Sequence, residues 1–140
     1  MATREVAIPE TVSHMKFILA VVDGCIESEG AVIELLGIGS LPENIHMFYA
    51  HRKPIHEKSI GLPLWHLHVT LRYLEDMLGL DASISREYEE YCEAGRHVLL
   101  VNVYRESEAK TVSSILGRAQ PRAGRILGYG HTAKLQALTD

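Results

Sequence analysis

The strongest constraint on the fold is a pattern that occurs twice in the chain. In the first half, the apolar run 17–22 is followed by an acidic segment with a central serine, 27–29, and then by an apolar stretch that ends at Gly37. In the second half, the run 98–103 is followed by a matching acidic segment, 106–108, and by another apolar stretch that ends at a glycine. Each copy is typical of a buried strand, a helix with a serine N-cap and a glycine stop.

With a weaker strand after each helix, the pattern predicts two βαβ units. One such unit cannot bury its sheet face alone, whereas two can pair through their strongest strands. We therefore expect an α+β, ferredoxin-like two-layer sandwich with a pseudo-symmetric repeat. Its four-stranded antiparallel sheet should have 16–22 and 98–104 as central strands and 45–50 and 125–129 as outer strands. The two crossover helices should cover one face.

The length of 140 residues, with 46% hydrophobic and 23% charged residues, is ordinary for one globular domain. We expect a single domain over 1–140, in which 16–50 is the first βαβ half, 51–95 a helical connection and 96–130 the second half. A last short helical turn or a frayed tail is expected after residue 130.

The connection between the halves contains two expected helices, 63–78 and 84–94, which Gly79 and Gly95 are expected to end. In the first, leucines recur at alternating spacings of three and four, which indicates a continuous apolar face. Such a stripe suits either the protein core, which the sequence favours, or a seam against a second subunit. The dimer interpretation stays open, and we expect a homo-oligomer, most simply a homodimer. The stripe consists of Leu64, Leu67, Leu71, Leu74 and Leu78.

Charge and hydropathy limit the partners of the chain. The formal net charge is −4, so general binding to a phosphate backbone is disfavoured and we expect no nucleic-acid partner. The basic residues Arg118, Arg122 and Arg125 are better explained as a solvated face than as a binding patch. The longest strongly apolar run is far too short for a membrane span, and the first 14 residues do not resemble a signal peptide. A cytoplasmic protein without a membrane partner is expected.

No motif in the chain indicates catalysis. Neither Cys25 nor Cys92 lies in a metal-binding or nucleophile signature, and both are expected to be reduced thiols. Glycine-rich phosphate and dinucleotide motifs are incomplete, so we expect no cofactor and no catalytic residue. An enzymatic function is therefore left open but disfavoured.

Histidine is the one unusual feature of the composition. Five of the eight histidines lie between residues 46 and 68, next to a polar segment that follows the second expected strand. In a helix, His66 and His68 point about 200° apart, which does not suit a shared metal ion. We expect no metal site, and treat the cluster as a set of candidate ligand-binding residues in a loop carried on a rigid scaffold. These candidates are His51, Arg52, His56, His66 and His68.

The turn and helix-end segments resemble those of the general stress or heat-induced stress proteins, a group of bacterial ferredoxin-like domains. The segment 39–45, Gly-Ser-Leu-Pro-Glu-Asn-Ile, is similar to the turn that leads into the second strand of that group. The segment 88–95, Tyr-Glu-Glu-Tyr-Cys-Glu-Ala-Gly, is similar to the one that precedes the third. The resemblance covers most of 16–129 and implies the ferredoxin-like fold. It brings no catalytic residue with it.

Two functions are consistent with the sequence. The first is a non-catalytic module that binds a partner or small ligand and oligomerises, linked to a stress response through the resemblance. The alternative is a metal-binding protein or an enzyme that uses the histidine-rich segment 51–68.

Overall fold

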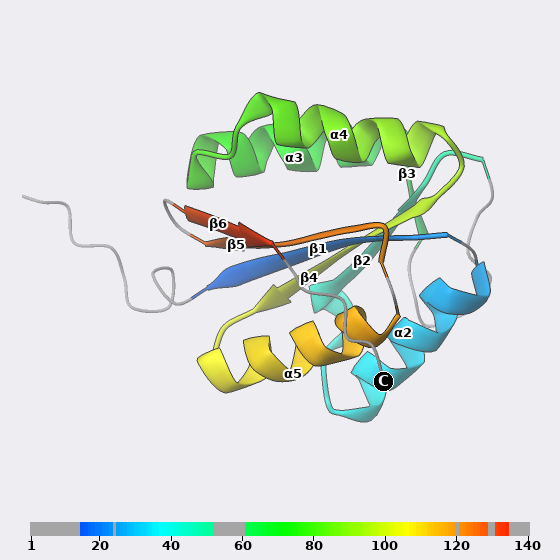
Figure 1. Cartoon of the computed structure of the whole chain (residues 1–140), viewed down its shortest axis with the longest axis vertical. Helices are drawn as coiled ribbons and strands as arrows, with labels where there is room; N and C mark the ends of the chain where they lie inside the picture. The colour runs from blue at the N-terminus through cyan, green and yellow to red at the C-terminus, as the bar shows by residue number, and fades with distance from the viewer. Residues whose placement is uncertain (1–14, 24, 52–60, 120, 129–130, 135–140) are drawn as a thin grey trace, which may run out of the picture.

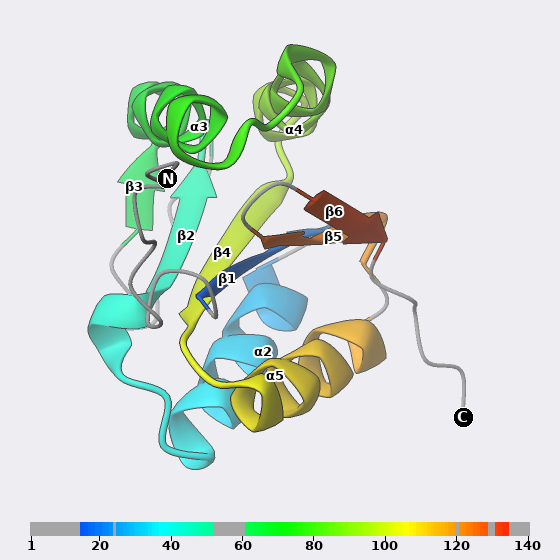
Figure 2. The same cartoon turned by 90° about the vertical axis from the view of Figure 1, so that its left-hand side faces the viewer.

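The computed structural model of the chain describes residues 15–23, 25–51, 61–119, 121–128 and 131–134. These residues form an α+β structure in three layers (Figure 1). A twisted sheet lies in the middle, α3 and α4 cover one of its faces, and α2 and α5 cover the other. Figure 2 shows the same arrangement from the side, with α3 and α4 on one side of the sheet and α2 and α5 on the other.

Within the described residues the sheet has six strands, in the order β3-β2-β4-β1-β5-β6. The four inner strands are each antiparallel to their neighbours, as are β5 and β6. The pairing of β2 with β3 is parallel, so the sheet is mixed. The strands are β1 (Lys16–Val22), β2 (Ile45–Tyr49), β3 (Gly61–Pro63), β4 (His97–Val103), β5 (Ala123–Gly128) and β6 (His131–Lys134).

Four α-helices lie in the described part of the chain. They are α2 (Cys25–Gly37), α3 (Leu64–Leu78), α4 (Ala82–Glu93) and α5 (Glu106–Arg118), and a short 3-10 turn, η1 (Pro42–Asn44), precedes β2. No helix among the described residues is both long enough and apolar enough to cross a membrane.

The two strongest apolar runs form the centre of the sheet, as the repeat predicts. β1 and β4 pair over seven residues, from Lys16 opposite Val103 to Val22 opposite His97. Alternate residues of each strand point to opposite faces. Ile18, Ala20 and Val22 therefore belong to the core beneath α2 and α5, whereas their neighbours belong to the core beneath α3 and α4.

Two separate hydrophobic cores result from this alternation. Against α2 and α5, buried side chains of the sheet pack on Val32, Leu35, Val112 and Leu116. On the opposite face they pack on the leucines of α3 and on Tyr88 and Cys92 of α4. The chain therefore buries both faces of its sheet, and the expected two-layer sandwich is wrong. The physical reason is the continuous apolar character of the central strands, which leaves neither face suited to water.

The expectation of four strands is also incomplete. β3 is only three residues long and β6 four, and neither carries the long apolar pattern by which strands are found in a sequence. The segment 131–134 pairs with β5 as the second strand of a hairpin, where we expected a helical turn or a frayed tail. Short edge strands depend on backbone pairing with a strand already in place, which only the tertiary structure supplies.

The serine caps predicted from the repeat are wrong in both halves. α2 begins at Cys25, so Ser28 lies inside the helix and is fully buried. α5 has Arg105 at its N-cap position and Ser107 in its first turn. The cap that does form is at α4, where the Asp81 carboxylate accepts a hydrogen bond from the backbone N–H of Ser83 at 2.8 Å.

The predicted glycine stops after the two connecting helices are confirmed. Gly79 ends α3 with φ of 75°, and Gly95 follows α4 with φ of 99°. Both values lie in the left-handed region, where a side chain is disfavoured and glycine is the usual C-terminal residue of a helix. The two helices can therefore turn sharply at these points and pack side by side on the sheet.

The leucine stripe of α3 is a core face, as the sequence favoured. Leu67, Leu71 and Leu74 are at most 1% exposed and lie against the sheet and α4. These leucines are thus covered by the sheet and α4 of the same chain, and they are not available as a seam against a second subunit. An interface on α3, if there is one, must use the opposite side of the helix.

This packing makes a quantitative prediction for Leu71. Replacing it by alanine removes a fully buried side chain from the core under α3, and we expect the free energy of unfolding to fall by about 2–5 kcal/mol. An Ile33→Ala control, at a side chain that is 56% exposed, should change the value by less than about 0.5 kcal/mol. Urea titrations of both variants make the measurement. Equally small decreases in the free energy of unfolding of the two variants would contradict the packing of α3 on the sheet.

Candidate functional site

The predicted ligand-binding residues do not converge in the described part of the chain. His51 follows β2, is exposed, and its Nε2 lies 2.7 Å from the backbone carbonyl oxygen of Glu93 at the end of α4. His51 therefore joins β2 to α4. Arg52 and His56 lie outside the described residues.

His66 and His68 both lie on α3 and contact different residues, as their spacing in a helix predicts. His68 Nδ1 lies 2.6 Å from a carboxylate oxygen of Glu89 on α4. The His66 ring instead contacts Trp65, with ring centroids 4.9 Å apart, and its buried Nδ1 has no hydrogen-bond partner among the described residues. The two histidines therefore do not form a chelating pair.

Glu89 is the centre of a polar cluster between α3 and α4. It is only 8% exposed, and the same oxygen that meets His68 accepts hydrogen bonds from both terminal nitrogens of Arg72, at 2.9 and 3.3 Å. Arg72 also meets Glu75, one turn further along α3, at 3.2 Å. A buried carboxylate is costly unless it is paired and hydrogen-bonded. The cluster therefore fixes the register of α3 against α4, and its polar groups are already satisfied by one another.

A second pair of histidines lies between β2 and α3. His46 is half-buried on the face of β2 that meets α3, next to Phe48, and it is close enough to His66 for their charges to repel. Burial, and secondly this repulsion, lower the pKa of His46 below its ordinary value of 6.5. The neutral form of the His46 imidazole is therefore favoured in the folded protein.

Within the described ranges no three histidine, cysteine, aspartate or glutamate side chains are grouped so that they could hold a metal ion. His46 and His66 form a pair without a third such partner, and His68 is bonded to Glu89. The metal-binding alternative thus gains no support from these residues.

A serine and a histidine do meet in the core, on the face covered by α2. The Ser28 hydroxyl lies 2.9 Å from His97 Nδ1, which is the spacing of a nucleophile and its base. Ser28 is, however, 0% exposed and His97 2% exposed, so a substrate cannot reach the hydroxyl. The pair joins α2 to the start of β4 and is structural. The sequence did not indicate it, because the two residues are 69 positions apart.

Cys92 is equally inaccessible. It is fully buried in the core under α4, and burial raises the pKa of its thiol to about 11. The thiolate, which is the nucleophilic form, is therefore scarce at neutral pH. Its neighbour Tyr88 is also fully buried, and burial raises the pKa of its phenol to about 12. Arg125 lies 5.6 Å from the centre of the Tyr88 ring and stabilises it there by a cation–π contact.

The arginines near the end of the chain form ion pairs and no basic patch. Arg118 meets Glu34 at 2.9 Å, and Arg125 meets Glu87 at 3.0 Å. Arg122 donates a hydrogen bond to Asp23 and thereby lowers the pKa of that carboxyl group, with Arg96 as a second donor to it. Their charges are thus locally compensated, although the Arg125 side chain is only 18% exposed.

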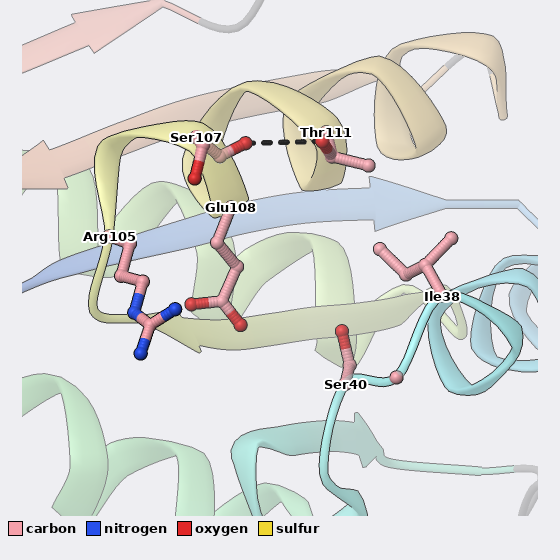
Figure 3. Close-up of a pocket in the computed structure, with 7 residues that line it drawn as sticks. Ile38, Ser40, Arg105, Ser107, Glu108 and Thr111 are labelled. Carbon is pink, nitrogen blue, oxygen red and sulfur yellow. Dashed lines mark hydrogen bonds between the residues drawn. The ribbon is translucent and has the colours of Figure 1, made fainter.

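A polar pocket lies where the end of α2 meets the beginning of α5 (Figure 3). Its volume is about 340 Å³, within the range of small-molecule sites. Its lining includes Arg105 and Glu108, which carry opposite charges, and Ser40, whose buried hydroxyl has no partner in the described structure. None of these residues was predicted as a site, because no motif spans the two halves of the repeat.

The second unusual surface is the outer side of α3. Trp65, Val69 and Tyr73 recur at a spacing of four, and their exposed fractions are 62%, 58% and 61%. Side chains at this spacing form a single ridge along a helix. We call these three residues the α3 ridge. The ridge was not predicted, because the leucine spacing marks the inward face of the helix but does not tell whether apolar residues outside that face stay exposed.

No match to this chain was found among protein families, curated proteins or solved structures. The function is therefore inferred from the geometry of the chain's own residues.

The His46 environment predicts a dependence of stability on pH. Because the pKa of His46 is lowered in the folded state, the unfolded chain binds more protons than the folded one at a pH just below 6.5. The contribution of neutral His46 to the free energy of unfolding is therefore complete above about pH 7. It declines as the pH falls through about 6.5 toward the lowered pKa. We expect His46→Gln to lose less stability than the wild type between about pH 7.5 and 5.5. Urea titrations at each pH measure this, and parallel curves would contradict it.

The burial of Cys92 predicts a protected thiol. In a Cys25→Ala background, we expect the native protein to react with Ellman's reagent at about pH 8 at least about 100-fold more slowly than a free cysteine does. In denaturant the same thiol should react at the ordinary rate. Fast reaction of the folded protein, with its circular dichroism unchanged, would show that α4 exposes this residue.

Proposed function

We propose that the chain is a non-catalytic interaction module that pairs with a second copy of itself through the α3 ridge. The observation that carries this proposal is the exposure of Trp65, Val69 and Tyr73 on one line of a helix whose other side is anchored in the core. Large aromatic side chains contribute most to protein interfaces when a partner buries them. Exposed in a row, they favour an interaction surface over a solvated helix face.

The symmetry of the ridge supports a second copy as the partner. In a two-fold dimer, each residue that contacts a partner residue is contacted by its equivalent in return. Val69 is the midpoint of the ridge, with an aromatic residue four positions away on either side. Two copies of α3 crossing at Val69 in opposite directions therefore place Trp65 of each chain near Tyr73 of the other. The ridge complements itself without a second kind of surface.

Charges near the ridge are compatible with this pairing. The ridge itself contains no charged residue, and the adjacent Arg72 is already paired with Glu75 and Glu89. Approach of a second α3 therefore does not bring an uncompensated arginine into the interface. The ridge spans only about 12 Å of helix, and stable interfaces bury roughly 800 Å² per partner. We accordingly expect a concentration-dependent dimer.

Several finer assignments belong to the same proposal. The inner strand order β2-β4-β1-β5, with every pairing antiparallel, supports describing the core as ferredoxin-like with added edge strands and helices. The resemblance of segments 39–45 and 88–95 to general stress proteins supports a role in a bacterial stress response. The net charge of −4 and the paired arginines support a cytoplasmic protein that does not bind nucleic acid.

The test uses a charge at the centre of the ridge. Val69→Asp places two carboxylates against each other on the two-fold axis of the dimer, and like charges at such a position are strongly unfavourable. We expect sedimentation velocity from about 1 to 500 μM to show a wild-type dimer at the upper end and a Val69→Asp monomer throughout.

Ile33→Asp is the matched control, since Ile33 is also β-branched, helical and 56% exposed, but lies on α2. It should dimerise like the wild type. A wild-type protein that stays monomeric over the whole range would overturn the proposal, as would equal dimerisation of both variants.

A further inference from the structure

The pocket between α2 and α5 lies on the face of the sheet opposite α3, and so apart from the α3 ridge (Figures 1 and 3). It is formed where the chain leaves α2 and where it enters α5. The two segments are more than 60 residues apart in the sequence and belong to different halves of the repeat. Its side-chain lining consists of Ile38, Ser40, Arg105, Ser107, Glu108 and Thr111.

Helix ends of opposite sign meet at this pocket. α2 and α5 follow the antiparallel strands β1 and β4 and themselves run in opposite directions. Glu34 meets Arg118 at the end of α5, whereas Ile38, directly after α2, lies beside Thr111, which is nearer the beginning of α5. The end of α2 carries a partial negative charge and the beginning of α5 a partial positive charge. The pocket therefore lies beside helix ends of both signs.

The beginning of α5 has unused donors. Its N-cap residue, Arg105, makes no capping hydrogen bond, so the backbone N–H groups of 106–108 lack the side-chain acceptor that a serine or aspartate would supply. The Glu108 side chain instead points back toward the residues before the helix. One of its carboxylate oxygens accepts a hydrogen bond from the backbone N–H of Tyr104 at 3.0 Å. This contact holds the carboxylate at the pocket and leaves its other oxygen available.

The two charged side chains of the pocket do not neutralise each other. Arg105 and Glu108 both line it, and no ion pair joins them in the described residues, although they are three positions apart on one helix. Five other arginines among the described residues are paired with acidic side chains. Both charges are thus available to a molecule that carries one group of each sign.

Ser40 supplies an independent observation. It is 8% exposed, and its hydroxyl oxygen has no hydrogen-bond partner in the described structure. Buried polar groups are almost always hydrogen-bonded, because an unpaired one loses its contacts with water without replacement. Figure 3 shows this hydroxyl directed toward the space between Glu108 and Ile38. The pocket thus contains a polar group whose partner the protein itself does not provide.

We propose that this pocket binds a small zwitterion, namely an α-amino acid with a compact apolar side chain. Its carboxylate faces Arg105 and the free N–H groups at the start of α5, and its ammonium group faces the available oxygen of Glu108. Ile38 forms the apolar wall for the side chain, and the Ser40 hydroxyl pairs with a polar group of the ligand. This binding goes beyond the proposed self-association and uses a different surface.

The class of ligand follows from the charges and the size of the pocket. A simple anion would satisfy Arg105 but would meet repulsion from Glu108, and a simple cation would meet the reverse. A zwitterion satisfies both. The volume of about 340 Å³ accommodates a molecule of the size of leucine and is small for a nucleotide or a peptide segment.

The experiment compares L-leucine with two derivatives that each lack one charge. N-acetyl-L-leucine has no ammonium group, and L-leucinamide has no carboxylate. By isothermal titration calorimetry of the full chain, we expect L-leucine to bind with a Kd of about 1 mM or tighter, and both derivatives to bind at least about tenfold more weakly. Equal binding of N-acetyl-L-leucine would identify a simple anion site and overturn the proposal. Absence of L-leucine binding at about 10 mM would also overturn it.

Variants locate the binding. Arg105→Gln and Glu108→Gln each remove one charge from the pocket, and Gln at 108 can still accept the bond from Tyr104. Each should weaken L-leucine binding about tenfold or more. Lys110→Gln is the matched control, since it removes a charge from the same helix outside this pocket and should bind like the wild type. Equal affinities of all three variants would contradict the assignment.

The two proposals can fail separately. Val69→Asp, which disrupts the α3 ridge, should retain L-leucine binding because the pocket lies across the sheet. Loss of binding in this variant while it remains folded by circular dichroism would show that the pocket depends on the dimer, contrary to the arrangement proposed here.

Discussion

The antiparallel pairing of β1 with β4 brings together seven residues from each strand, and almost all of them are buried on both sides of the sheet. A strand pair of this kind cannot remain in contact with water, so each of its faces requires a helical layer. α2 and α5 arise from the repeat and cover one face. The connection between the halves provides α3 and α4 for the other. The position of every helix, and hence of both surfaces discussed above, follows from this central pair.

Buried polar groups between the layers then fix the register of the helices. On one face, Glu89 joins α4 to α3 through His68 and Arg72. On the other, Ser28 joins α2 to β4 through His97. Hydrophobic contacts alone tolerate small shifts of a helix, whereas a buried hydrogen bond is lost if the register changes. These interactions therefore explain why several histidines that attract attention in the sequence serve the packing of the chain.

The two candidate surfaces are consequences of the layers. α3 covers the outer part of its face beside the short edge strand β3, and with its leucines turned inward it presents aromatic residues outward (Figure 2). On the opposite face, the antiparallel course of α2 and α5 brings helix ends of opposite charge together and leaves Ser40 beneath them. One surface is an apolar helix face and suits a protein partner. The other is polar and concave and suits a small molecule.

Much of the architecture could be predicted from the sequence, because it depends on local periodicity. The apolar run at 16–22 matches β1, the leucine spacing identifies α3 and its inward face, and Gly79 and Gly95 end their helices as expected. These features require only the periods of helix and strand and the freedom of glycine at positive φ. The α+β class follows from them.

What the tertiary structure alone decided concerns pairs of residues far apart in the chain. The strands β3 and β6 exist because other strands are beside them, and Ser28 is buried and not a cap because His97 lies opposite. The pocket joins residue 40 to residue 105, and the outward ridge of α3 is defined by which side the sheet occupies. A sequence pattern describes the residues along a single helix or strand. The contacts that make a site arise between elements, where the packing of the whole chain sets the distances.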